Sequence, residues 1–133
     1  MAGPSFEDDA TIPDEADLWR RIHPSWVIPD QNIGSLRVSS AAFDDSPDGS
    51  PLSMLLADIV RETGRSESDV LVGFQDYSLA ALKAADARTN GQKVSPTPTK
   101  GEPAHVSVAG PKTKSTKRGM ARASRWVVQP NHV

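Results

Sequence analysis

The chain has 133 residues, a net charge of −2 and no cysteine, and 37% of its residues are hydrophobic. That length and composition predict a single folded domain, and the lack of cysteine excludes a disulfide framework, a thiolate metal site and a cysteine nucleophile. The acidic N-terminus has no secretory signal pattern, and no stretch approaches the roughly 20 apolar residues of a membrane span. We therefore expect a soluble, cytoplasmic protein with no membrane partner, folded over residues 12–129, with flexible ends at residues 1–11 and 130–133.

The charges are unevenly distributed along the chain. Six acidic residues precede the first basic residue: Glu7, Asp8, Asp9, Asp14, Glu15 and Asp17. Six basic residues follow the last acidic one: Lys112, Lys114, Lys117, Arg118, Arg122 and Arg125. The two ends either attract each other within the fold or leave the basic end available for a polyanion.

The first predicted element, residues 14–22, fits two secondary structures. A helix would place Leu18 and Ile22 one turn apart, whereas a strand would put both on one face by simple alternation. We favour the strand, because Pro24 disfavours the helical conformation for the residue before it. Residues 26–28 are then apolar and extended, and a loop follows.

The clearest local pattern lies at residues 36–64. Residues 36–43 are loosely extended and lead into a turn rich in Asp, Ser, Pro and Gly. Residues 51–63 then predict an amphipathic helix, with a serine N-cap, a proline in the first turn and a glycine after the last residue. Its apolar stripe has helical spacing and comprises Leu52, Leu55, Leu56, Ile59 and Val60. We expect the rest of the domain to pack around this stripe.

The remaining predicted elements are short. Strands are expected at residues 70–72, 77–82, 105–108 and 126–128, a helix at 84–90, and a basic, weakly amphipathic segment at 112–124. The alanines of residues 77–88 leave helix and strand both open there, and residues 93–103 form a proline- and glycine-containing loop. The fold class is thus α+β, with four to six short strands packed against the central helix and one or two shorter helices.

Two histidines and two serines are the candidate catalytic residues. His23 and His105 each adjoin a proline-marked bend and a predicted strand, and a histidine can act as acid or base near neutral pH. Ser39 and Ser40 precede two alanines, where a ligand can approach the backbone and two hydroxyls can bind phosphate or ribose. The simpler alternatives are that each histidine bonds a backbone carbonyl and that the serines line a packed strand edge. His132 lies at the chain end, where we expect no site.

Several familiar site signatures are missing. The sequence has no G-x-S-x-G elbow, no P-loop and no G-x-G-x-x-G loop. Asp44, Asp45 and Asp48 could supply oxygen ligands to Mg²⁺ or Ca²⁺, but their spacing differs from that of an EF-hand. Their position before a helix N-terminus is sufficient to account for them. We therefore predict no metal site.

Two predicted strands carry residue types found in nucleotide sites: Arg20 or Arg21 with His23 on the first, and Ser39 with Ser40 on the second. This order, followed by a helix and further strands, resembles small ADP-ribosyltransferase-like domains. The resemblance implies NAD held by the first strand and the serine-bearing second strand. The family's catalytic glutamate on a late strand has no counterpart, because Glu102 lies in the predicted loop and His105 occupies the strand.

Two functional hypotheses follow. The first is a binding or regulatory module without a cofactor, which contacts an acidic partner such as nucleic acid through residues 112–125; its contact residues would be Lys112, Lys114, Lys117, Arg118, Arg122, Arg125 and Trp126. The second is a small nucleotide- or NAD-utilising enzyme with one cleft formed by His23, Ser39, Ser40 and His105. We favour the first, because it requires only the observed charge asymmetry. A solvated helix that neutralises the acidic N-terminus is the alternative role for the basic segment.

Overall fold

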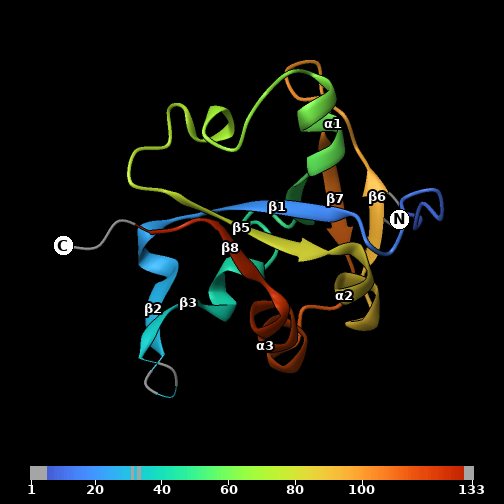
Figure 1. Ribbon diagram of the computed structural model, residues 1–133. Coiled ribbons are helices and arrows are strands. Elements are labelled where there is room, and N and C mark those ends of the chain that lie inside the picture. Colours follow the sequence, from blue (N-terminus) through green and yellow to red (C-terminus); the bar gives the residue numbers. More distant parts are fainter. Residues whose placement is uncertain (1–5, 31, 33, 131–133) are drawn as a thin grey trace.

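The computed structural model describes residues 6–30, 32 and 34–130, and Figure 1 shows the arrangement of their helices and strands. The strands are β1 (Asp17–Ile22), β2 (Val27–Asp30), β3 (Ser35–Val38), β4 (Leu52–Leu56), β5 (Ser78–Lys83), β6 (Lys93–Pro96), β7 (His105–Ala109) and β8 (Arg125–Val128). The α-helices are α1 (Ala57–Glu62), α2 (Ala84–Thr89) and α3 (Lys114–Ala123). Three 3₁₀ turns accompany them: η1 (Pro24–Trp26), η2 (Ser40–Phe43) and η3 (Asp69–Leu71).

Six strands form one antiparallel sheet in the order β6-β7-β4-β1-β5-β8, and β2 and β3 form a separate hairpin. β1 pairs with β5 over its whole length, but it pairs with β4 only where Leu18 faces Leu56 and Trp19 faces Leu55. In Figure 1, β1 and β5 run across the view, whereas β6 and β7 lie roughly vertical in it, in opposite directions. The sheet therefore consists of two halves that are joined at one end and separate beyond Trp19.

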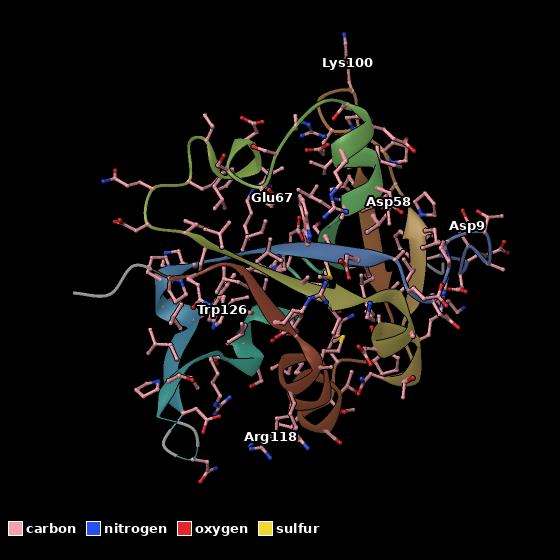
Figure 2. The ribbon with its side chains drawn as sticks, viewed as in Figure 1. Asp9, Asp58, Glu67, Lys100, Arg118 and Trp126 are labelled. Carbon is pink, nitrogen blue, oxygen red and sulfur yellow. The ribbon has the colours of Figure 1, made fainter. Side chains whose placement is uncertain are left out.

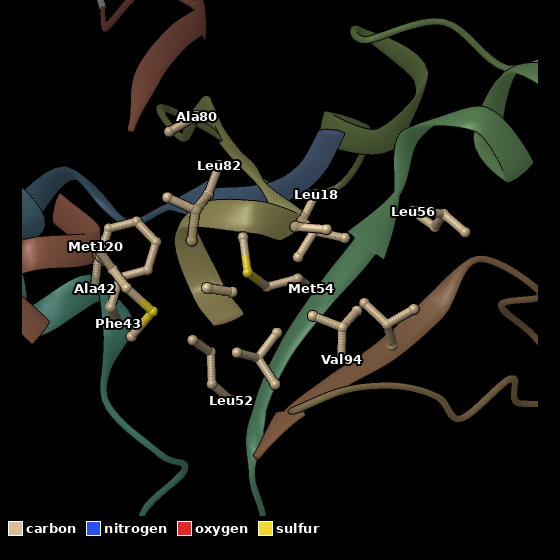
Figure 3. Close-up of a cluster of buried hydrophobic side chains, with 14 of the residues drawn as sticks. Leu18, Ala42, Phe43, Leu52, Met54, Leu56, Ala80, Leu82, Val94 and Met120 are labelled. Carbon is tan, nitrogen blue, oxygen red and sulfur yellow. The ribbon is translucent and has the colours of Figure 1, made fainter. Parts of the chain in front are cut away.

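Both faces of the sheet are covered, so the domain has two cores. α2, α3 and η2 cover one face, whose buried side chains include Leu18, Phe43, Leu52, Met54 and Met120 (Figure 3). α1 and the segment around η3 cover the other face, and Figure 1 shows α1 on the opposite side of β1 from α2 and α3. The second core includes Trp19, Leu55, Val60, Val70 and Leu79. This two-sided burial explains why few strands show a polar face.

The predicted central helix over residues 51–63 is wrong. Residues 52–56 form β4, and only α1 is helical within that range. The apolar residues do fit a helical period, but Leu52 and Met54 enter one core while Leu55 enters the other. A strand inside a covered sheet is apolar on both sides, and periodicity cannot distinguish it from a buried helix. The predicted fold class is corrected accordingly: the domain is mostly strands, with short helices and no long amphipathic helix among the described residues.

Most of the other predicted elements are confirmed. Strands are present close to residues 17–22, 77–82, 105–108 and 126–128, α2 matches the predicted helix, and the basic segment is helical as α3. The strand predicted at residues 70–72 is wrong, because this segment forms η3, with Val70 buried and Val72 exposed. The loop predicted at residues 93–103 contains β6, which pairs with β7 at the edge of the sheet.

Part of the acidic N-terminus is fixed to the domain by Arg88 of α2. The Arg88 guanidinium donates to the Asp8 carboxylate at 3.0 Å, to the Asp14 carboxylate at 2.7 Å and to the Asp9 carbonyl at 2.9 Å. Ile12 is buried in the first core. Of the predicted flexible ends, residues 1–11 and 130–133, the described part of the chain leaves out residues 1–5 and 131–133, which include His132. No helix in the described ranges is long and apolar enough to cross a membrane.

Candidate functional site: a basic groove and a polar cleft

A basic groove of about 950 Å³ lies between α3 and the β2–β3 hairpin. α3 packs its apolar side, with Met120 and Ala121, against η2 and the first core, and this leaves its basic side outward. The groove is lined by the arginines Arg37, Arg118, Arg122 and Arg125 and by Ser39, Ser40 and Trp126. The fold thus brings the basic segment next to the two serines, although about eighty positions separate the segment from the serines in the sequence.

Three of the six basic residues predicted to bind a polyanion are engaged within the protein. Lys112 is nearly buried, with 4% of its side chain exposed, and its Nζ lies 2.9 Å from both the Asp45 carboxylate and the Val108 carbonyl. Lys117 Nζ lies 3.1 Å from the Asp44 carboxylate, and this hydrogen bond is the main cause that lowers the pKa of Asp44.

Arg125 also has an internal partner, because it donates to Asp17 at 2.7 Å. Among the described residues, this contact is the one ion pair that joins the six acidic residues near the N-terminus to the six basic residues near the C-terminus. Arg125 nevertheless lines the groove, and half of its side chain remains exposed.

The other three basic residues form a stripe on α3 without a counter-charge among the described residues. Lys114, Arg118 and Arg122 are exposed and spaced four residues apart, and none has an ion-pair partner in the part of the chain that the structure describes. Figure 2 shows Arg118, in the middle of α3, pointing away from the rest of the molecule. Like charges at this spacing destabilise a helix by about 0.2–0.5 kcal/mol per pair. An anion bound along the stripe would relieve that repulsion.

A smaller, polar cleft of about 230 Å³ opens where β1 and β4 separate. Arg20 bridges the gap: its Nε donates to the Ala42 carbonyl and its Nη1 to the Ser53 carbonyl, both at 3.0 Å. Arg21 also lines the cleft, with its Nε 2.6 Å from the Val70 carbonyl and its guanidinium 4.2 Å from the centre of the Phe74 ring. Burial lowers the pKa of both arginines, because removal from water disfavours the charged form.

His105 faces this cleft and lies in a chain of hydrogen bonds. Its Nε2 is 3.0 Å from Ser53 Oγ, and its Nδ1 is 3.1 Å from the Thr97 carbonyl and 2.8 Å from Thr97 Oγ1. A carbonyl oxygen only accepts, so in the neutral ring the Nδ1 carries the hydrogen and Nε2 accepts the hydrogen of Ser53. Thr97 Oγ1 continues the chain to Ser107 Oγ at 2.9 Å.

Aromatic side chains form the opposite wall of the cleft: Trp26, Phe74 and Tyr77. His23 packs edge-on against Tyr77 at 5.3 Å and against Trp26 at 5.9 Å between ring centres. The His23 Nδ1 accepts the Ser25 amide at 3.0 Å and so caps η1. His23 is thus adjacent to the cleft but has a structural hydrogen bond of its own.

The four predicted catalytic residues are divided between the two hollows. His105 lines the cleft and His23 contacts its aromatic wall, whereas Ser39 and Ser40 line the basic groove. The two serines lie at the start of η2 instead of on a strand, and Ser39 Oγ caps this turn by accepting the Ala41 amide at 3.2 Å. No sequence pattern marks Ser53 as a site residue, because it lies inside the segment predicted to be helical.

The three aspartates before β4 all have partners within the protein. Asp44 and Asp45 pair with lysines. Asp48 accepts hydrogen bonds from the Ser50 hydroxyl and from the Ser50 amide, the latter at 2.9 Å, and the hydroxyl first and the amide second lower the pKa of Asp48. No cluster of three or more potential metal ligands occurs among the described residues.

Comparisons of the chain with protein-family models, with curated proteins and with solved structures find no match. The resemblance to ADP-ribosyltransferase-like domains rests on an element order that the structure does not show, because Ser39 and Ser40 lie at the start of η2 and residues 52–56 form β4 instead of a helix.

Proposed function

We propose that the protein binds single-stranded nucleic acid along the basic groove between α3 and the β2–β3 hairpin. The observation that carries the proposal is the stripe of Lys114, Arg118 and Arg122, which has no ion-pair partner among the described residues. Arg118 and Arg122 line the groove together with two further arginines. The chain as a whole carries a net charge of −2, so this concentration of positive charge is local. Lysine and arginine at regular spacing are suited to successive phosphates.

The groove also offers contacts for sugars and bases. Ser39 and Ser40 place hydroxyl groups beside the arginines, and hydroxyls commonly bind phosphate and sugar oxygens. An adjoining hollow of about 630 Å³ has no basic residue in its lining and shares five residues with the groove: Pro29, Asp30, Ser35, Leu36 and Trp126. Trp126 is fixed there, because its Nε1 donates to the Leu36 carbonyl at 3.1 Å. A single strand could lay its phosphates along α3 and stack a base on this indole.

The test is a titration of a fluorescently labelled single-stranded oligonucleotide at several salt concentrations. Neutralisation of about three phosphates predicts a slope of log affinity against log salt of about −2, which is an approximately 20-fold loss between 50 and 200 mM salt. The double substitution Arg118→Gln with Arg122→Gln removes two of these contacts. It should reduce the slope to about −0.7 and weaken binding at 50 mM salt.

The double substitution Lys93→Gln with Lys100→Gln is the matched control. Both lysines are exposed, and Figure 2 shows Lys100 at the end of the molecule opposite Arg118. The control changes the net charge equally but should leave affinity and slope close to those of the unaltered protein. Equal losses in the two double variants would contradict a localised site. Equally tight binding of poly-glutamate would contradict a nucleic-acid partner.

A further inference from the structure

The cleft between β1 and β4 contains a serine and a histidine in the arrangement of an activated nucleophile. Ser53 Oγ lies 3.0 Å from His105 Nε2, and the far side of the imidazole bonds the Thr97 carbonyl. A nucleophile, a base within hydrogen-bond reach and a third group that orients the base are the three parts required. Ser53 is half-buried and lines the cleft, so a small molecule can reach its hydroxyl.

We infer that Ser53 and His105 hydrolyse small acyl esters that carry an anionic group. Ser53 Oγ attacks the carbonyl carbon while its proton passes to His105 Nε2. The bond from the acyl carbon to the alcohol oxygen then breaks, and that oxygen takes the proton from His105. In the second half, water gives a proton to His105 as its oxygen attacks the acyl carbon. Ser53 Oγ leaves with that proton, and the free acid is released.

The walls of the cleft define the substrate class. Arg20 and Arg21 bring two guanidinium groups to the cleft, and each keeps a terminal nitrogen with no hydrogen-bond partner in the described chain. Charged donors in a site with little water suit both an anionic substituent and the negative oxygen formed during attack. Trp26, Phe74 and Tyr77 supply an apolar wall. Drug-sized ligands need pockets of about 300–1,000 Å³, so this cleft, of about 230 Å³, takes a smaller molecule.

The arrangement differs from the serine sites that a sequence motif would reveal. Ser53 lies on β4 and has no strand-to-helix elbow, and His105 is on the neighbouring strand β7. Ser53 lies in the part of β4 that does not pair with β1, and it lines the cleft that opens there. In this unpaired part of β4, the Arg20 side chain of β1 donates to the Ser53 carbonyl in place of a backbone amide.

The first test is covalent labelling of the full chain with a fluorophosphonate probe, followed by peptide mass spectrometry. We expect the label on Ser53, its complete loss in Ser53→Ala, and unchanged labelling in Ser50→Ala, which alters an exposed serine three residues earlier. His105→Gln should slow labelling by about 100-fold or more, as removal of a general base usually does. Labelling elsewhere, or labelling of Ser53 that does not depend on His105, would overturn the inference.

The second test measures hydrolysis of two 4-nitrophenyl esters, the neutral acetate and the negatively charged hydrogen succinate. The unaltered protein should prefer the succinate, and Arg21→Gln should lower the succinate rate much more than the acetate rate, so that the preference is lost. Ser53→Ala removes one hydroxyl, and its melting temperature should stay close to that of the unaltered protein. If that variant is folded and still hydrolyses both esters at the original rate, the inference is wrong. Arg118→Gln with Arg122→Gln should leave labelling and hydrolysis unchanged, so this result is independent of nucleic-acid binding.

Discussion

Arg20 connects the two halves of the sheet at the point where they separate, and replacing it tests this role. Its guanidinium donates to the Ala42 and Ser53 carbonyls and lies 5.2 Å from the centre of the Trp26 ring. Hydrogen bonds from a charged donor contribute about 1.5–3 kcal/mol each, and a partly buried cation–π contact about 0.5–2 kcal/mol. Desolvation of the charge opposes these terms by several kcal/mol.

We therefore expect Arg20→Met to lower the free energy of unfolding by about 2–4 kcal/mol, mainly because two carbonyls lose their donor. Arg20→Lys keeps the charge but cannot reach both carbonyls from one planar group, so its loss should be about half as large. The measurement is unfolding in urea at pH 7, followed by tryptophan fluorescence. Trp19 and Trp26 both line the cleft and report on its opening.

Arg37→Met is the matched control for Arg20→Met. Its side chain is 49% exposed and lies 3.8 Å from the Asp30 carboxylate, so its loss should cost at most about 0.5 kcal/mol. If Arg20→Met is as stable as the unaltered protein, the bridge across the open sheet is not what stabilises it. A loss as large in Arg20→Lys as in Arg20→Met would show that the planar, two-carbonyl geometry is not the cause.

Three further predictions concern contacts elsewhere in the fold. The hydrogen bonds from Arg65 hold the pKa of Glu102 below its ordinary value. The carboxylate therefore stabilises the fold above about pH 5, and this contribution is lost as pH falls through the lowered pKa. In urea unfolding, the stability of Glu102→Gln should fall less between about pH 5 and 3 than that of the unaltered protein. Gly110→Ala should destabilise the protein by about 1–3 kcal/mol in the same assay, because an added Cβ would lie 2.7 Å from the Gly91 carbonyl oxygen. Arg88→Met should accelerate hydrogen exchange of the Asp9 amide, which bonds to β6, by about tenfold, while amides of β1 keep their protection.

The elements with strong local signals were predictable from the sequence. Pro24 marks the end of β1, and Gly91 follows α2 with a φ of 77°. Along α3, the spacing of the basic residues places them on one face, which stays in solvent. Each signal acts within a few residues, through steric limits on the backbone or through the positions of side chains on one turn. The basic C-terminal segment as a candidate binding surface came from the same local information.

The segment containing β4 shows where local information fails. Leu52, Leu55 and Leu56 fit a helix as well as a strand, and the pattern alone cannot separate them. β7 and β1 decide the matter by supplying backbone partners on both sides of β4, and the two cores then bury its alternate side chains. Ser53 lies in this segment, so no local pattern marks it as a site residue.

The sequence by itself determined the chain's charge asymmetry, its freedom from thiol chemistry and the short elements whose ends are marked by proline, glycine or capping residues. Only the tertiary structure decided which charges remain free, since Lys112 and Lys117 find carboxylates about seventy positions away while Arg118 finds none among the described residues. It also placed His105 against Ser53, 52 positions earlier, in the opening between β1 and β4. The physical reason is that a site is a set of distances, and distances between remote residues are set by strand pairing and core packing, which no local pattern encodes.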